Sequence, residues 1–214
     1  ETLRNSGLSL KDLTKAFSVD EVGDMFFKEY KKNYEDIIFY VTGKRMVKVS
    51  NKWEERQEGN SDETIMQEFS RFQNPEKAVR DYVKKLMGRL VFLQFLQKKG
   101  WLGVRANTEW GTGDSEFLQN LFALTEDKDH FIDNVLEALF NDLNSEDEKQ
   151  LTQYRTPYLN GGLFERDASD ETEFPRPAKY MQQMLDFFSS YNFTIDENDP
   201  DDAEVGVDPE MLGR

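Results

Sequence analysis

Hydrophobic residues recur at intervals of three and four along most of the 214-residue chain, which is the spacing of one face of an α-helix. Ser18 and Glu21 form the pattern of a capping box, and Gly43 follows the last apolar position of the first long run. The sequence therefore predicts one long amphipathic helix that ends at Gly43. Its apolar and aromatic face consists of Val22, Met25, Phe26, Tyr30, Tyr34, Ile37, Ile38 and Val41.

The densest apolar run belongs to a second long helix, predicted from Pro75 to Gly100. Asn74 and Pro75 supply an N-cap and a first-turn proline, and Glu76 adds a first-turn acid. From Leu90 onward, apolar residues cover most of the helix circumference, so we expect this helix to lie at the centre of the fold. Its inward positions are Val79, Val83, Leu86, Met87, Leu90, Leu93 and Leu96.

The rest of the chain predicts shorter helices and one break in the helical pattern. Between Tyr154 and Glu165, Asn160-Gly161 stands between apolar flanks and predicts a small β-hairpin or an ordered loop, with 193–195 as an added strand. The fold class is therefore mainly α, a multi-helix domain around a central apolar helix at about 75–99 with a hairpin or loop near 154–165. Further helices are predicted at 60–72, 114–124, 129–141, 147–153 and 177–190, and soft points of the chain at 47–60 and after Asp196.

Composition fits a folded protein of this kind. Hydrophobic residues make up 37% and aromatic residues 13% of the chain, which is enough for a sizeable core despite 32% charged residues. The absence of cysteine excludes disulfides and thiolate metal sites and agrees with a cytoplasmic location. The longest apolar stretch, Leu90 to Leu96, is far shorter than the ~20 residues of a spanning helix, so no membrane insertion is expected.

Charge is distributed unevenly. The net charge of -15 disfavours a freestanding nucleic-acid binder. Between Lys77 and Arg105, however, eight basic residues stand against one acid, Asp81. Two interpretations stay open: the basic side chains solvate the outside of a buried helix and pair with acids elsewhere, which we favour, or they follow a DNA backbone. The candidate nucleic-acid contacts are Lys77, Arg80, Lys84, Lys85, Arg89, Lys98, Lys99 and Arg105.

No catalytic signature fits the sequence. The single histidine, His130, excludes paired-histidine zinc motifs and is interpreted as a surface or capping residue. Gly43-Lys44-Arg45 lacks the pattern of a phosphate loop, and the acids after Asp196 fail the register of a calcium loop. Acid-x-Lys triplets of the kind used by metal-dependent nucleases occur only in helical or loop patterns, which leaves an autonomous carboxylate hydrolase without a motif. We predict no catalytic, cofactor-binding or metal-binding residue.

The last two dozen residues suggest a connection to something further. Eight acids lie between Asp196 and Glu210, and Asp208-Pro209-Glu210 has the N-cap, proline and first-turn acid of a helix start. Only four residues follow, which is too short a helix to bury a face. We therefore expect the chain to be a piece of a longer polypeptide, with 191–214 as an acidic connector.

Four stretches carry a family resemblance: 27–45, which begins Phe-Lys-Glu-Tyr and ends Thr-Gly-Lys-Arg; 80–103, RDYVKKLMGRLVFLQFLQKKGWLG; 158–165, YLNGGLFE; and 191–214. With these, the chain resembles the helical connecting region of type II (IIG-like) restriction-modification enzymes, in which an endonuclease and an N6-adenine DNA methyltransferase share one polypeptide. The methyltransferase motifs of that family, an aromatic-Thr-Pro segment and an Asn-Pro-Pro-aromatic loop, are missing here, so no family site residue can be assigned.

The resemblance implies a noncatalytic fragment that spaces and orients the two enzymatic domains. It implies a helical spacer at 1–190, divisible into an arm at 1–60 and a core at 61–190, and a connector at 191–214 leading to a methyltransferase. The implied partners are the adjoining nuclease and methyltransferase domains, and DNA through the parent protein. No cofactor is expected in the fragment itself, whereas the parent would use S-adenosylmethionine, with Mg²⁺ for a nuclease. The alternative function is a DNA-backbone-binding module acting through 77–105.

Overall fold

The computed structural model describes residues 19–146, 151, 153–159 and 162–191, and the elements in these ranges are mainly α-helical. This confirms the predicted fold class at the level of a mainly α protein with one small antiparallel sheet. The elements are α2 (Val19–Thr42), β1 (Lys44–Val49), β2 (Lys52–Gln57), α3 (Glu63–Phe69), α4 (Pro75–Lys98), α5 (Phe117–Leu124), the π-helix η2 (Ile132–Leu136), α6 (Glu137–Asn144), the 3₁₀ helix η3 (Ala168–Glu171) and α7 (Ala178–Ser189).

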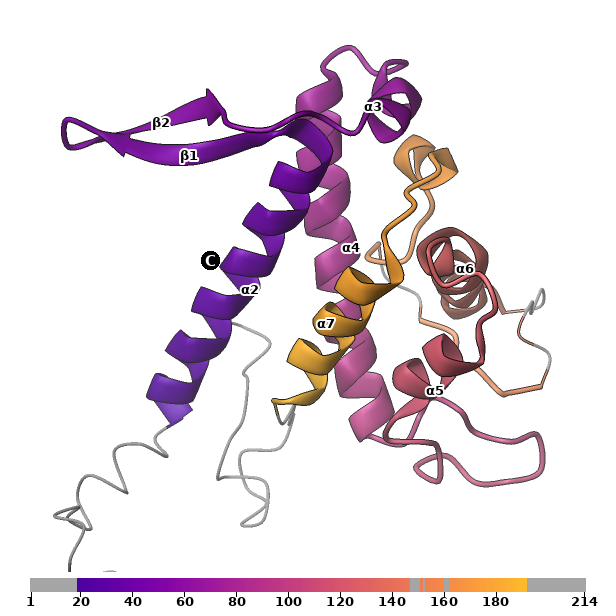
Figure 1. The fold of residues 1–214 in the computed structure, drawn as a ribbon. Helices are drawn as coiled ribbons and strands as arrows, with labels where there is room; N and C mark the ends of the chain where they lie inside the picture. The colour runs from indigo at the N-terminus through magenta and orange to yellow at the C-terminus, as the bar shows by residue number, and fades with distance from the viewer. Residues whose placement is uncertain (1–18, 147–150, 152, 160–161, 192–214) are drawn as a thin grey trace, which may run out of the picture.

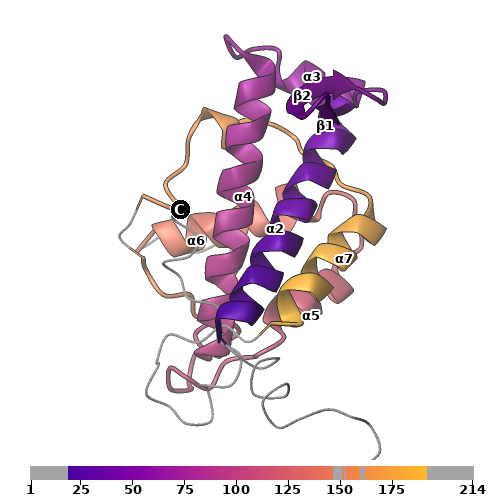
Figure 2. The same ribbon diagram turned by 90° about the vertical axis from the view of Figure 1, so that its left-hand side faces the viewer.

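Two helices of 24 residues, α2 and α4, form the frame of the fold and pack side by side (Figures 1 and 2). Helix α4 also packs against α3, α7 and η3. From Leu90 to Lys98, only Phe92 and Lys98 of α4 are exposed, because helices and loops cover it on several sides. The buried residues of α4 are Val79, Tyr82, Val83, Leu86, Met87, Arg89, Leu90, Val91, Leu93, Gln94, Phe95, Leu96 and Gln97.

Side-chain caps define where the helices of the first half begin. The Asn74 side chain accepts a hydrogen bond from the Lys77 amide at 3.1 Å, and Pro75 occupies the first turn of α4. The Asp62 carboxylate accepts the Ile65 amide at 3.0 Å and caps α3. The predicted start of α4 is therefore confirmed, and α3 begins within the predicted range.

The second half of the chain places α5, α6 and α7 beside the middle and lower parts of α4 in Figure 1. The predicted helix at 129–141 consists of the π-helix η2 followed by α6. Asp133 Oδ1 in η2 accepts the Phe174 amide at 2.9 Å, and the Asp129 carbonyl accepts the Arg176 amide at 2.7 Å. These bonds fasten the start of η2 to the segment that leads into α7.

The hairpin alternative for 154–165 is not the one that the described residues support. The two strands lie instead at Lys44–Val49 and Lys52–Gln57, mostly within the segment 47–60 that we predicted as a soft point of the chain. Among the described residues of 154–165, backbone pairing is limited to one isolated bridge between Arg155 and Val104, which fits the ordered-loop alternative. Asn160 and Gly161, which carried the turn prediction, lie outside the described residues.

Other boundaries differ for local reasons. Helix α5 begins at Phe117 rather than Asp114, because the Asp114 carboxylate accepts the Glu116 amide at 2.8 Å and forms a turn before the helix. Helix α7 matches its prediction within one residue at each end. The helix predicted at 147–153 falls largely outside the described residues, as does the acidic connector at 191–214 apart from Tyr191, and the strand at 193–195 falls there entirely.

The two described ends of the chain meet at one end of the helical frame. The Phe26 ring, near the start of α2, stacks on Phe187 at 5.4 Å between centroids and meets the edge of Tyr191 at 5.1 Å. A 24-residue helix is about 36 Å long, so the β-hairpin that follows α2 stands far from both ends (Figure 1).

Candidate nucleic-acid interface

The β-hairpin projects from the C-terminal end of α2 and leaves most of its surface uncovered (Figure 1). Ser50 and Asn51 have φ values of 46° and 72°, and two consecutive positive values are the mark of a type I′ turn. All six residues of β2 are exposed, and 65% of Trp53 is accessible to solvent. The hairpin therefore presents an uncovered ribbon whose backbone and indole are open to contact.

The base of the hairpin is fixed to the end of α2 by backbone geometry. Gly43 has φ +69°, and a Cβ there would lie 2.3 Å from the Gly59 carbonyl oxygen, so only glycine fits. The Gln57 amide nitrogen donates to the carbonyls of Thr42 at 2.9 Å and Gly59 at 2.7 Å. The chain therefore leaves and returns at a closed, hydrogen-bonded neck.

Two ion pairs attach the same base to the first turns of α4. Lys44 Nζ lies 2.5 Å from Glu76 Oε1, and Arg80 pairs with Glu55 of β2. The hydrogen bond from Lys44 lowers the pKa of Glu76, with Arg80 contributing further. These contacts orient the hairpin relative to α4, although each pair is partly exposed and contributes only modestly to stability.

Like charges face each other near the base of the hairpin. The register places Arg45 opposite Arg56, an arrangement that destabilises a strand pair unless other groups compensate. Arg45 lies 3.7 Å from the Asp36 carboxylate and 3.9 Å from the Phe39 ring centroid, and Arg56 lies 3.4 Å from Glu54.

The tip of the hairpin carries cations without acidic partners. Lys48 stands opposite Trp53, and Lys52 stands opposite Val49. Within the described part of the chain, neither lysine forms an ion pair, and both are exposed. We call Lys48, Lys52 and Trp53 the hairpin tip.

The exposed ribbon, its two lysines and its exposed indole together favour nucleic acid as the binding partner. A two-stranded ribbon fits the major groove of duplex DNA, lysine side chains contact phosphates, and an exposed indole can stack on a base. Sequence reasoning missed the tip because its Ser-Asn turn lacks the Asn-Gly signal, which occurred instead at 160–161. The available signal was the polar pair Ser50-Asn51 between two stretches with basic residues at intervals, Lys44 to Lys48 and Lys52 to Arg56.

The basic stretch predicted as a DNA contact divides into two groups. Lys77 pairs with Asp81 at 2.5 Å, Arg80 with Glu55 and Glu76, and Lys85 and Arg89 with acids near η3. The remaining four are exposed and form no ion pair within the described ranges: Lys84, Lys98, Lys99 and Arg105. Lys84 and Lys98 are 14 residues apart on α4, or about 21 Å along its axis, so Lys84 stands apart from Lys98 and Lys99.

Arg89 corrects the prediction of a phosphate contact at that position. Only 1% of it is exposed, and its guanidinium donates to Asp170 at 2.8 and 3.2 Å, to the Leu163 carbonyl at 2.9 Å and to the Glu165 carbonyl at 3.1 Å. Lys85 Nζ adds a second cation 2.8 Å from Asp170 Oδ1. Arg89 therefore fastens the 163–171 segment to α4 and presents no surface to DNA.

The acids around this network have strongly shifted pKa values. Burial raises the pKa of Glu137 to about 7, with the nearby Asp170 charge adding to the shift. Burial also acts to raise the pKa of Asp167, but hydrogen bonds from Lys85 and Ser169 outweigh it and lower the value to about 2. The network is a structural ion cluster in which one acid, Glu137, is poorly compensated.

Other candidate chemistry is sparse in the part of the chain that the structure describes. No group of three or more His, Asp or Glu side chains there is arranged to hold a metal ion. His130 is partly exposed, and a hydrogen bond with Asp127 at 2.9 Å raises its pKa. This matches its interpretation as a surface residue beside the start of a helix. None of the helices within these ranges has the length and apolar content to cross a bilayer.

Comparison with known proteins gives one relevant similarity. The chain is 25% identical over 207 residues to a protein of Methanocaldococcus jannaschii described as a putative type II restriction enzyme and methyltransferase. The match covers 91% of this chain but only 16% of that protein. No family model and no solved structure matches the chain.

Proposed function

Starting from this similarity to a restriction-modification protein, we propose that the chain is a noncatalytic helical arm of such a protein. The arm orients a nuclease part and a DNA adenine-N6 methyltransferase part, and it carries the hairpin tip toward DNA. S-adenosylmethionine, and Mg²⁺ for cleavage, would bind to those other parts of the parent protein.

The observation that carries this proposal is the arrangement of the frame. Phe26 and Tyr191 touch, so whatever precedes α2 and whatever follows α7 attach at the same end of the frame. The hairpin follows the opposite end of α2, about 24 Å along the helix axis from Phe26. This geometry suits an arm that leaves a common base and returns to it, rather than a rod that separates two domains at its ends.

A methyl-transfer assay tests the noncatalytic part of the proposal. The 214-residue chain is incubated with DNA and radiolabelled S-adenosylmethionine, and incorporation into DNA is measured. No incorporation above a protein-free control is expected. Methyl transfer by the chain would overturn the proposal.

The second candidate function is direct DNA-backbone binding, and the free cations of the hairpin tip favour the hairpin as its site. Replacing Lys48 and Lys52 with Gln removes two phosphate contacts, so the slope of log K against log salt should become shallower by about 2. Fluorescence anisotropy with a duplex at several salt concentrations measures this slope.

The matched control replaces Lys84 and Lys98 with Gln, which removes the same charge from the exposed side of α4. We expect the control to change the slope by much less than the hairpin variant does. The opposite result would transfer DNA binding to the basic stretch of α4. Equal, unchanged slopes in both variants would remove direct DNA binding from the account.

A further inference from the structure

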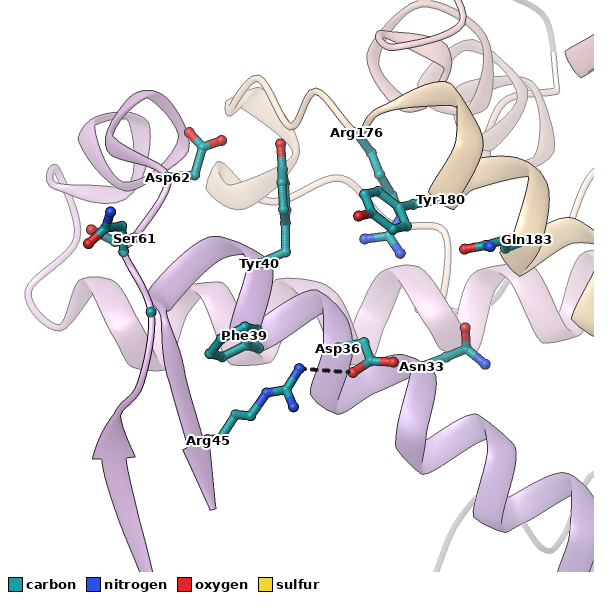
Figure 3. A pocket seen from close by; sticks show the side chains of 12 residues that line it. Asn33, Asp36, Phe39, Tyr40, Arg45, Ser61, Asp62, Arg176, Tyr180 and Gln183 are labelled. Atoms are coloured by element: carbon teal, nitrogen blue, oxygen red, sulfur yellow. Dashed lines mark ion pairs between the residues drawn. The ribbon is translucent and has the colours of Figure 1, made fainter. Parts of the chain in front are cut away.

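A cavity of about 600 Å³ lies beside the base of the hairpin, between α2, the segment before α3 and the start of α7 (Figure 3). Its volume falls in the range of sites that bind small organic molecules. Three aromatic rings line it, from Phe39, Tyr40 and Tyr180, together with the side-chain amides of Asn33 and Gln183.

Arg176 is the unusual member of this lining. It is only 6% exposed, yet its guanidinium forms no ion pair or hydrogen bond with any group in the described part of the chain, and its Nε is fully enclosed. Figure 3 shows the guanidinium beside the Tyr180 ring and directed toward α2, and its Cζ lies 5.7 Å from the centroid of that ring. Burial lowers the pKa of Arg176 to about 10, so the side chain still carries its charge at neutral pH. A buried, charged and unpaired guanidinium is costly to stability, and such groups are normally paired.

The local sequence holds this arginine in place. Pro175 and Pro177 flank it and restrict its backbone to extended conformations, and its amide donates to the Asp129 carbonyl at 2.7 Å. Phe174 before it is fully buried, and α7 begins directly after it. Arg176 is therefore positioned in advance, without an anion to position it.

The acids near the cavity are engaged elsewhere. Asp36 has its nearest cation in Arg45, at 3.7 Å, and Asp62 accepts the Ile65 amide as the cap of α3. Arg45 also lines the cavity, so two guanidiniums face the same space. Arg176 is the one whose charge no described acid matches within 4 Å.

We propose that this cavity binds a small organic phosphate of about the size of a mononucleotide, with Arg176 as the anchor for the phosphate. A guanidinium fork matches a phosphate through two parallel N–H···O bonds. Arg45 lies at the rim but is paired with Asp36, so among the described lining residues the unmatched positive charge is that of Arg176. The polar and aromatic lining contacts the organic part. The depth of Arg176 favours a terminal phosphate over the phosphodiester of a duplex, which cannot reach a side chain buried this far.

The test compares the wild-type chain with Arg176→Met by thermal unfolding and isothermal titration calorimetry. The probes are inorganic phosphate, adenosine 5′-monophosphate, succinate and a short single-stranded DNA. We expect the monophosphate to raise the Tm of the wild type and to bind at least tenfold more weakly to Arg176→Met. Arg176→Lys keeps the charge but loses the fork, so its affinity should fall between the two.

The same variants distinguish a binding residue from a structural one. Since Met removes an unpaired buried charge and keeps the apolar stem, Arg176→Met without ligand should unfold at the same or a higher temperature than the wild type. Arg166→Met, which replaces an exposed arginine away from the cavity, should leave binding unchanged. A large loss of Tm in Arg176→Met would overturn the proposal, as would equal binding by both proteins or no binding by either. Tighter binding of succinate than of the monophosphate would replace the phosphate with a carboxylate ligand, and tighter binding of the single-stranded DNA would overturn the assignment to a small molecule.

Discussion

Replacement of Asp170 by Ala is the sharpest test of the ion cluster under η3. The Asp170 side chain is 1% exposed and accepts hydrogen bonds from two guanidinium nitrogens of Arg89. Lys85 Nζ lies 2.8 Å from the same carboxylate, and the Asp167 amide donates to it at 3.0 Å. Without Asp170, the buried Arg89 loses its acidic partner within the described residues, whereas Lys85 keeps Asp167 at 2.9 Å. The segment that Arg89 holds through the Leu163 and Glu165 carbonyls would lose its charged anchor.

The magnitude follows from the cost of an uncompensated buried charge. Breaking a buried ion pair by removing one partner costs about 3–5 kcal/mol, and here Arg89 keeps two carbonyl acceptors, which places the expected loss toward the lower end. For a chain of this size, each kcal/mol corresponds to roughly 2–4 °C in Tm. Asp170→Ala should therefore lower the Tm by about 6–15 °C.

Urea unfolding followed by circular dichroism measures the loss, and a double-mutant cycle with Arg89→Met isolates the coupling between the two side chains. The double variant should be less destabilised than the sum of the single variants, because removing both charges leaves neither uncompensated. Lys84→Met, on the exposed side of the same helix, should change stability by less than about 0.5 kcal/mol. A loss below about 1 kcal/mol for Asp170→Ala would refute the description of this cluster as a buried anchor.

Two further predictions use single positions with internal controls. Because burial holds the pKa of Glu137 at about 7, above its unfolded value, the folded state binds an extra proton between about pH 4.5 and 7 and loses stability as pH rises through this window. Urea unfolding of Glu137→Gln should therefore show stabilisation of about 1–2 kcal/mol at pH 8, a value reduced for partial exposure, and little change at pH 4.5. An equal effect at both pH values would contradict this prediction. Gly43→Ala should destabilise the protein by about 2 kcal/mol or more, because the φ of Gly43 is +69° and a Cβ would meet the Gly59 carbonyl. Gly88→Ala inside α4 is the control: no atom lies nearer than 4.0 Å to the added Cβ, so it should stabilise the protein by about 0.5–1 kcal/mol in the same unfolding assay. Equal effects of the two substitutions would contradict the description of the hairpin neck as closed to any side chain at position 43.

The long helices could be predicted from the sequence because local signals and the apolar period agree there. Asn74-Pro75 caps α4 in the way its residue types suggest, and the apolar face of α2 is buried at Phe26, Ile37 and Val41. The hairpin could not be predicted in the same way. Its strands are rich in Lys, Arg and Glu, its turn is Ser-Asn, and the contacts that hold it, from Glu76 and Arg80, come from a helix more than 20 residues later in the chain.

The candidate sites depended even more on tertiary structure. Lys85 and Arg89 belong to one basic run in the sequence, and only the approach of Asp170, 81 residues after Arg89, shows that they form part of a buried cluster. Arg176 gave no signal by itself, since an arginine between two prolines is compatible with an exposed loop. Its importance follows from the burial of its side chain and from the acids that pair with other groups, neither of which a single sequence contains.

Site-specific photo-crosslinking tests most directly whether the arm carries the hairpin to DNA. The chain has no cysteine, so a single cysteine at Asn51, at Lys84 or at Ser190 can carry a photo-crosslinker without background labelling. After irradiation with duplex DNA, we predict covalent protein–DNA adducts from position 51 and few from 84 or 190. Adducts that form mainly at position 84 or 190, with none at position 51, would contradict the account.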